Sequence, residues 1–345
     1  MLTAYNYYEP EEENRVRKNL KDSALFEREL SLAERYSGCH PSGTVFRESC
    51  PMCGSASVHP FYEKWGVRYV RCGSCASVFA DVSQEAAENF RGMEARRALR
   101  LSEAYQAEAA AARSMMWQET LDWLRFRSYR YLGRNGGLAV CDAGCRWRGF
   151  RDMLLSSGLC GSYQAFDSIL DDAGGIPVPG PCSTDGSGTF FDDRPRGTDS
   201  GADIMLALDY MQQLHSPDGL LALAGEHLKK GGLLVISTRL GTGLDTLLLK
   251  EKNRNVFPYE YILLPSREGI RAMLEKAGFE VLEFTTPGTF DVNYIKANLD
   301  AVSGTAEFVH YFLSRSTPEL EAEFQRFIQK AGLSSHAQVI ARKTA

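Results

Sequence analysis

Two cysteine pairs with identical internal spacing stand out in the first quarter of the chain. In each pair two residues separate the cysteines, and 18 residues lie between the pairs, which are Cys50/Cys53 and Cys72/Cys75. This spacing is typical of a structural zinc ribbon, in which four thiolates fill the metal's tetrahedron and leave no open position. The metal would therefore fold the module rather than catalyse. The alternatives are ordinary buried cysteines or disulfides, and a cytosolic setting disfavours disulfides.

A glycine lies next to a cysteine in each pair, and five further cysteines lie outside the pairs. We expect Gly54 and Gly73 to supply the sharp turns that bring the backbone close to the sulfurs. The other five cysteines include Cys141 and Cys145, for which small buried thiols are the expected role.

Acidic residues follow successive apolar segments in the second half of the chain. The segments 138–142, 163–167, 189–191 and 202–208 alternate with helical patterns, which predicts βαβ units and a mainly parallel sheet. The aspartates that end or follow these segments are Asp142, Asp167, Asp192, Asp193 and Asp209. Ligands of open α/β sheets bind beyond the carboxyl ends of the strands. Asp142 opens an Ala-Gly144 turn where a ligand can approach the backbone, and Asp167 can accept both hydroxyls of a ribose. Together these positions favour an adenosyl-ligand site.

Three elements here resemble the class I S-adenosylmethionine-dependent methyltransferases. They are residues 140–144, 202–210 and 228–237, the last reading Leu-Lys-Lys-Gly-Gly-Leu-Leu-Val-Ile-Ser. The resemblance covers about residues 137–345. It implies an α/β, Rossmann-like seven-stranded sheet with an antiparallel last strand, and S-adenosylmethionine as cofactor.

The whole chain looks like a narrower group, the bacterial methyltransferases with an N-terminal zinc ribbon that are associated with surface-polysaccharide synthesis. The elements that resemble this group are residues 50–54, 68–72, 277–281, 286–292 and 333–336. The resemblance implies a sugar or glycan-type small-molecule acceptor and a role in polysaccharide biosynthesis.

The cofactor loop departs from the family's Asp-x-Gly-x-Gly-x-Gly pattern. Arg146 and Arg148 stand where the second and third glycines are expected. Glycine suits those positions because they need unusual φ values and close approach to the cofactor. Arg146 would either fill the cofactor's space, pair with the cofactor's carboxylate, or lie at the surface of a rearranged loop.

The candidates for catalysis also differ from the family's residues. Gln212-Gln213 replaces a common Glu-His pair, with His215 nearby as a substitute, and a later Glu-His element reads Glu260-Tyr261. His215, Glu260 and Tyr261 are therefore the candidate catalytic residues. The sequence supports two alternatives. One is a methyltransferase, and the other is a degenerate, non-catalytic or repurposed relative that binds another ligand or serves as a partner subunit.

Composition and charge limit the classes of protein to which the chain can belong. The 345 residues are 44% hydrophobic and 24% charged, which indicates a globular chain long enough for two compact units. A net charge of −5 argues against a nucleic-acid binder. The N-terminus does not resemble a signal peptide and no apolar run could span a membrane, so we expect a cytoplasmic protein. The expected division is an N-terminal helical segment at 1–43, a zinc ribbon at 44–82, a helical linker or lid at 83–132, and a methyltransferase-like domain at 133–345 with a helical insertion at about 292–332.

Overall fold

A central sheet with helices on both faces organises the second half of the chain. The computed structural model describes residues 27–28, 30–32, 47–91, 99, 102–144, 147–166, 201–258, 260–302 and 306–344. Within these, six strands pair in the order β5-β4-β6-β7-β10-β9. Their bounds are β4 Leu138–Asp142, β5 Cys160–Ala165, β6 Ala202–Leu208, β7 Leu228–Arg239, β9 Phe279–Thr285 and β10 His336–Lys343.

The direction of the strands matches the expected fold. Neighbouring strands from β5 to β7 are parallel, whereas β10 runs antiparallel to both β7 and β9. This is the Rossmann-like methyltransferase sheet with its antiparallel last strand, as predicted. The strand expected at 189–191 lies outside the described residues. The last strand in the sequence, β10, lies between β7 and β9 rather than at the edge of the sheet.

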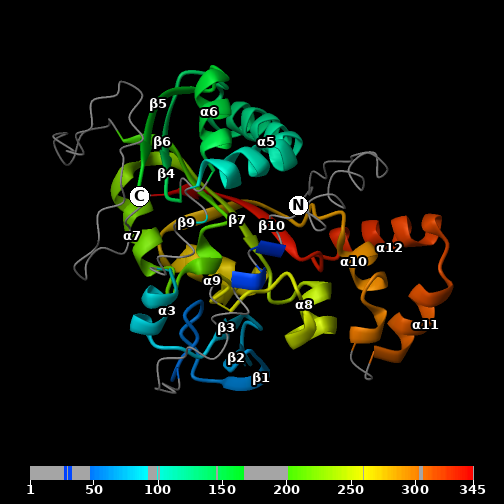
Figure 1. Ribbon diagram of the computed structural model, residues 1–345. Coiled ribbons are helices and arrows are strands. Elements are labelled where there is room, and N and C mark those ends of the chain that lie inside the picture. Colours follow the sequence, from blue (N-terminus) through cyan, green and yellow to red (C-terminus); the bar gives the residue numbers. More distant parts are fainter. Residues whose placement is uncertain are drawn as a thin grey trace.

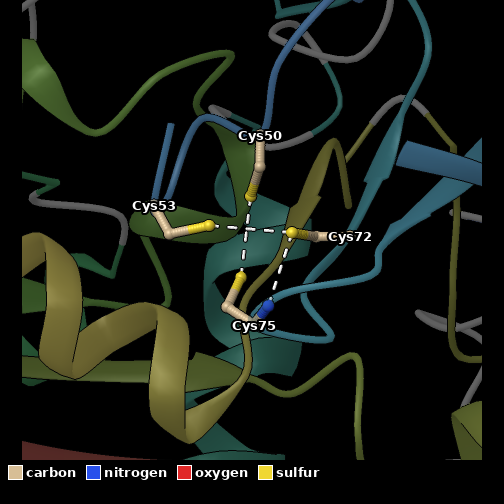
Figure 2. A group of neighbouring side chains, drawn as sticks. All are labelled: Cys50, Cys53, Cys72 and Cys75. Atoms are coloured by element: carbon tan, nitrogen blue, oxygen red, sulfur yellow. Dashed lines mark hydrogen bonds between the residues drawn. The ribbon is translucent and has the colours of Figure 1, made fainter. Parts of the chain in front are cut away.

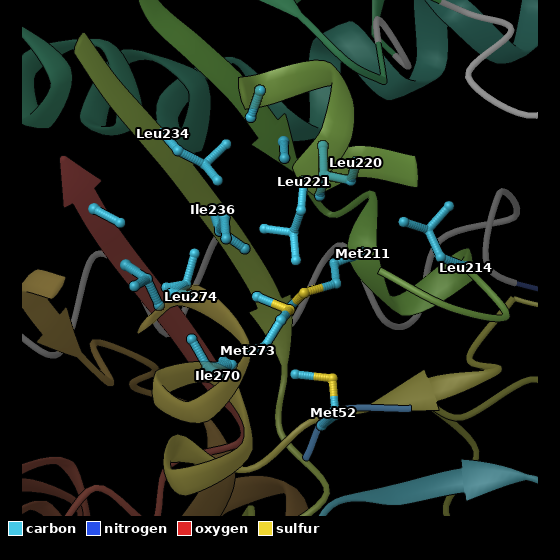
Figure 3. Packing of buried hydrophobic residues seen from close by; sticks show 14 of the residues in the cluster. Met52, Met211, Leu214, Leu220, Leu221, Leu234, Ile236, Ile270, Met273 and Leu274 are labelled. Carbon is cyan, nitrogen blue, oxygen red and sulfur yellow. The ribbon is translucent and has the colours of Figure 1, made fainter. Parts of the chain in front are cut away.

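Both faces of the central sheet are buried, and alternate residues of each strand face opposite layers. On one face Val140, Ile204 and Val235 pack with α5 (Glu103–Leu132) and α6 (Arg148–Ser156). On the other face Met205, Leu234 and Ile236 pack with α7 (Asp218–His227) and α9 (Arg267–Lys276). Figure 3 shows Leu234 and Ile236 with side chains from both helices. Near-continuous apolar strands of this kind are what a sheet covered on both faces requires.

A second, smaller sheet contains the cysteine segment and one strand from far along the chain. Here called the N-terminal sheet, it has the order β1-β2-β3-β8, all antiparallel. The strands are β1 Val58–Lys64, β2 Val67–Cys72, β3 Val78–Ala80 and β8 Leu263–Leu264, and they lie below the central sheet in Figure 1. Sequence patterns did not predict β8. The N-terminal sheet therefore includes a strand of the segment that follows β7.

The two sheets also share a core. Met52, between the first two cysteines, is buried beside Met211, Ile270 and Met273 (Figure 3). The N-terminal sheet is thus packed into the main hydrophobic core rather than tethered by a linker.

Capping residues place the C-terminal helices as expected. The Ser266 side chain accepts a hydrogen bond from the amide of Gly269 at the start of α9. Thr317 caps α12 (Pro318–Lys330) with proline in the first turn. α10 (Asp291–Lys296), α11 (Glu307–Arg315) and α12 pack on one another at one side of the molecule in Figure 1. The remaining helices are α3 Gln84–Arg91, α8 Leu244–Leu249 and the 3-10 turns η2 Met211–Gln213, η3 Lys250–Lys252 and η4 Leu299–Ala301.

Among the described residues, no helix is long and apolar enough to cross a membrane.

Candidate metal and cofactor sites

The four cysteines of the repeated pairs converge on one point. Their Sγ atoms all lie within 4.8 Å of one another, and Figure 2 shows the four side chains pointing together. The Cys50–Cys75 and Cys53–Cys72 Sγ distances are both 3.6 Å. Disulfide sulfurs lie about 2 Å apart, so these cysteines are thiols. Zn–S bonds of about 2.3 Å give a tetrahedron edge of about 3.8 Å, which the observed distances fit.

Each cysteine pair forms a tight backbone knuckle. The amide of Gly54 donates to the carbonyl of Cys50 at 2.8 Å, and the amide of Ala76 donates to that of Cys72 at 3.0 Å. Both residues have positive φ, 75° at Gly54 and 62° at Ala76. Gly73 lies in the second turn, as expected, but the left-handed residue of this knuckle is Ala76, which follows the pair. Gly73 leaves room for Ser57, whose Oγ would lie 2.4 Å from an added Cβ.

The thiols influence one another's ionisation. A hydrogen bond from Cys50 is the largest cause that lowers the pKa of Cys75 to about 4, while the same contact raises the pKa of Cys50. Backbone amides of Ser74 and Cys75 both lie 3.4 Å from Cys72 Sγ and donate to it. A cluster of sulfurs that stabilises negative charge in this way is suited to a divalent cation.

The turn after β4 is closed by Asp142. Its Oδ1 accepts from the Gly144 amide at 3.0 Å and its Oδ2 from the Tyr163 hydroxyl at 2.8 Å. Gly144 lies against Tyr210, since an added Cβ would come within 3.0 Å of that ring. These contacts join the ends of β4, β5 and β6, and a side chain at Gly144 would press against the Tyr210 ring.

Asp209 lies at the same edge of the sheet. It has φ 51°, a left-handed conformation that aspartate tolerates better than most residues. Its amide donates to the Ser237 carbonyl at 3.0 Å, and its Oδ1 lies 3.5 Å from Nε2 of His336. Asp209 therefore connects the ends of β6, β7 and β10.

Several expected ligand residues lie outside the described residues. They are Arg146, Asp167, Asp192 and Asp193. Arg148 is described, and it begins α6 with an exposed side chain. Between Gly144 and α6, Trp147 stacks on Tyr105 of α5 with centroids 6.0 Å apart.

Glu260 and Tyr261 lie between the two sheets. Glu260 is buried, at 4% exposure, and both of their amides donate to the Phe257 carbonyl at 2.9 Å. The Tyr261 carbonyl accepts from the hydroxyl of Tyr69 at 2.8 Å. The guanidinium carbon of Arg239, the last residue of β7, is 5.9 Å from the Tyr261 ring centroid.

His215 lies at a different contact between the sheets. Arg47 Nε donates to its Nε2 at 3.0 Å, and Arg47 NH2 donates to its carbonyl at 2.6 Å. The Val82 carbonyl is 3.1 Å from the same Nε2. Burial lowers the pKa of Arg47 to about 10, against the opposing effect of Asp81, so the guanidinium remains a donor at neutral pH. The Nε2 atom of His215 is thus engaged in contacts with the segments that flank the N-terminal sheet.

Sequence analysis missed the tyrosines and the arginine that shape this edge. Tyr163 lies inside β5, two residues before its end, Tyr210 lies two residues beyond β6, and Arg239 is the last residue of β7. The polar run Ser237-Thr-Arg239 at the end of β7 was a usable signal, because carboxyl ends of parallel strands share one edge.

The fold and its loop at the end of β4 define a methyltransferase-like α/β protein. The methyltransferase domain family matches residues 99–284, and the chain belongs to that family. No curated protein sequence matches the chain significantly.

Solved structures resemble the chain only distantly. The geranyl diphosphate C-methyltransferase of Streptomyces coelicolor A3(2) is 16% identical with a TM-score of 0.39, over 70% of this chain and 86% of that one. The plantazolicin methyltransferase BpumL is 12% identical with a TM-score of 0.41, over 75% and 94%. The [4+2]-cyclase SpnF is 17% identical with a TM-score of 0.34, over 66% and 82%.

Proposed function

We propose that this protein transfers a methyl group from S-adenosylmethionine to a sugar or glycan-type acceptor, in polysaccharide biosynthesis. The observation that carries the proposal is the turn at the end of β4, where Asp142, Gly144 and Tyr210 are in close contact. Membership of the methyltransferase domain family supports it. Asp142, Gly144 and Asp209 would border the cofactor, together with Arg146, Asp167, Asp192 and Asp193.

Methyl transfer from a sulfonium needs chiefly an aligned acceptor in a site shielded from water. A hydroxyl acceptor also benefits from a base. Of the three candidates, we assign that role to Glu260, with Tyr261 beside it. Glu260 is buried between the sheets, whereas the Nε2 of His215 already contacts Arg47 and Val82.

Cys50, Cys53, Cys72 and Cys75 would hold a structural Zn²⁺. The 3.6 Å sulfur distances and the closed set of four thiols support this role. The metal would fix the knuckles, and through them the N-terminal sheet that carries β8 next to Glu260 and Tyr261.

The test is formation of S-adenosylhomocysteine from S-adenosylmethionine, measured with a panel of nucleotide-linked and free sugars. Acceptor-dependent turnover is expected, and Glu260→Gln should reduce it while cofactor binding persists. The matched control is Glu275→Gln, an exposed position on α9. Cofactor binding without turnover on any sugar would favour the non-catalytic alternative, and equal turnover in Glu260→Gln would remove Glu260 from the mechanism.

A further inference from the structure

Four polar side chains meet where the N-terminal sheet packs against the end of β7. They are Tyr62, Arg239, Asn253 and Asn255, and three of them are more than nine-tenths buried. The Tyr62 hydroxyl, Arg239 Nε and the Nδ2 atoms of both asparagines are buried without a hydrogen-bond partner among the described residues. Buried polar atoms are nearly always paired, so four in one place indicate a missing ligand or ordered water.

Hydrogen bonds connect the two asparagines to each other and to Tyr294. Asn253 Oδ1 accepts from the Asn255 amide at 3.0 Å and lies 3.3 Å from the donating hydroxyl of Tyr294. Burial raises the pKa of both Tyr62 and Tyr294, and the charge of Arg239 opposes the rise at each. The contacts agree with this, because the Arg239 guanidinium carbon is 5.9 Å from the Tyr261 ring, and Tyr69, which donates to the Tyr261 carbonyl, stacks on Tyr62.

The guanidinium of Arg239 is held in place from its other side. Its NH2 donates to Asp245, a carboxylate that is only 2% exposed. Asp245 also accepts from the hydroxyl of Ser335, whose amide donates to Asp291 at 2.8 Å. This network orients the guanidinium and leaves its Nε available.

The four atoms share one chemical property, because each of them can donate a hydrogen bond. A carboxylate accepts several such bonds, and its bonds to a charged donor are about twice as strong as neutral ones. Arginine with amide donors matches the planar shape of a carboxylate better than lysine does. We propose that Arg239, Asn253, Asn255 and Tyr62 bind a carboxylate of the methyl acceptor, which would then be an acidic sugar. The inference rests on the proposed function.

The four atoms are buried, so binding of a carboxylate requires a local movement of the chain around them. Leu30 packs in the same apolar cluster as Tyr62 and Phe257. Beside it, the Glu27–Arg254 ion pair spans 3.0 Å, with side chains 55% and 51% exposed. Exposed ion pairs contribute little to stability, so loss of this pair costs little, whereas displacement of the segment would also expose the buried Leu30.

The test is calorimetric titration of the full-length protein with two sugars that differ only in the carboxylate, D-galacturonate and D-galactose. Galactose 1-phosphate tests whether a phosphate serves instead. We expect galacturonate to bind at least about tenfold more tightly than the other two, as hydrogen bonds to a charged group predict. Equal binding of galacturonate and galactose, or preference for the phosphate, would overturn the proposal that this site binds a carboxylate.

Two variants assign the binding to these side chains. Arg239→Lys keeps a cation for Asp245 but removes Nε, and Tyr62→Phe removes a hydroxyl that has no hydrogen-bond partner among the described residues. Each should weaken galacturonate binding about tenfold without loss of folding. Arg342→Lys, at the opposite end of the β7–β10 pair, is the control and should change nothing. Unchanged affinity in both variants, or a galacturonate-soaked crystal with only water on the four atoms, contradicts the proposal.

A separate titration with S-adenosylmethionine distinguishes the two proposals. Cofactor binding without preference for galacturonate would contradict only the proposed carboxylate site. Galacturonate binding that depends on Arg239, in a protein that binds no cofactor, would contradict the proposed methyltransferase activity and support the carboxylate site.

Discussion

The hydroxyl of Tyr69, on β2, donates a 2.8 Å hydrogen bond to the carbonyl of Tyr261, just before β8. The ring of Tyr69 is completely buried and stacks on that of Tyr62. This bond joins the N-terminal sheet to the segment that carries Glu260, so the position of the candidate base depends on the N-terminal sheet.

Tyr69→Phe should therefore lower the stability of the whole protein. Removing the hydroxyl leaves the partly buried Tyr261 carbonyl without that donor, which costs about 1 to 3 kcal/mol. Urea unfolding gives the free energy of unfolding. Tyr129→Phe, at a 64% exposed position of α5, is the control. Equal stability of the two variants would show that the bond contributes nothing.

Exchanging alanine and glycine at the left-handed positions of the two cysteine knuckles should change stability in opposite directions. Ala76→Gly relieves a left-handed residue, φ 62°, and should stabilise the protein by about 1 kcal/mol. Gly54→Ala introduces the same strain at φ 75° and should destabilise it by about 1 to 2 kcal/mol. Both changes can be measured by urea unfolding at saturating zinc. Two shifts of the same sign would contradict the knuckle geometry.

Zinc should be bound at one equivalent per chain and should support both sheets. Chelation, or Cys53→Ser, is expected to lower the melting temperature and to expose the Met52 side of the main core, because Met52 lies between two ligands. Metal analysis and thermal unfolding check this. Cys160→Ser, distant from the cluster in sequence, should leave the zinc content at one. A metal-free protein with an unchanged melting temperature would exclude a structural zinc.

The sequence predicted those features that have a local signal. Buried strands such as 202–208, the caps at Ser266 and Thr317, and the repeated cysteine pairs all depend on neighbouring residues. The pairing of β3 with β8 was not predicted, because it joins Phe79 to Leu263 across most of the chain. Ala76 at positive φ was missed for a related reason, since alanine gives no sign of a left-handed turn. The contact of His215 with Arg47 likewise appears only in three dimensions.

Binding of S-adenosylmethionine at the Asp142–Gly144 turn is the central claim, and isothermal titration of wild type and Gly144→Ala tests it. Wild type should bind one equivalent. Gly144→Ala should bind at least about tenfold more weakly, since its Cβ would lie 3.0 Å from Tyr210 and displace the turn. Gly225→Ala, on α7, should bind as wild type does, since the added Cβ would meet no other part of the described structure within 4 Å outside its own helix. A folded wild-type protein with no detectable binding at millimolar cofactor, or equal affinity in Gly144→Ala, would contradict the account.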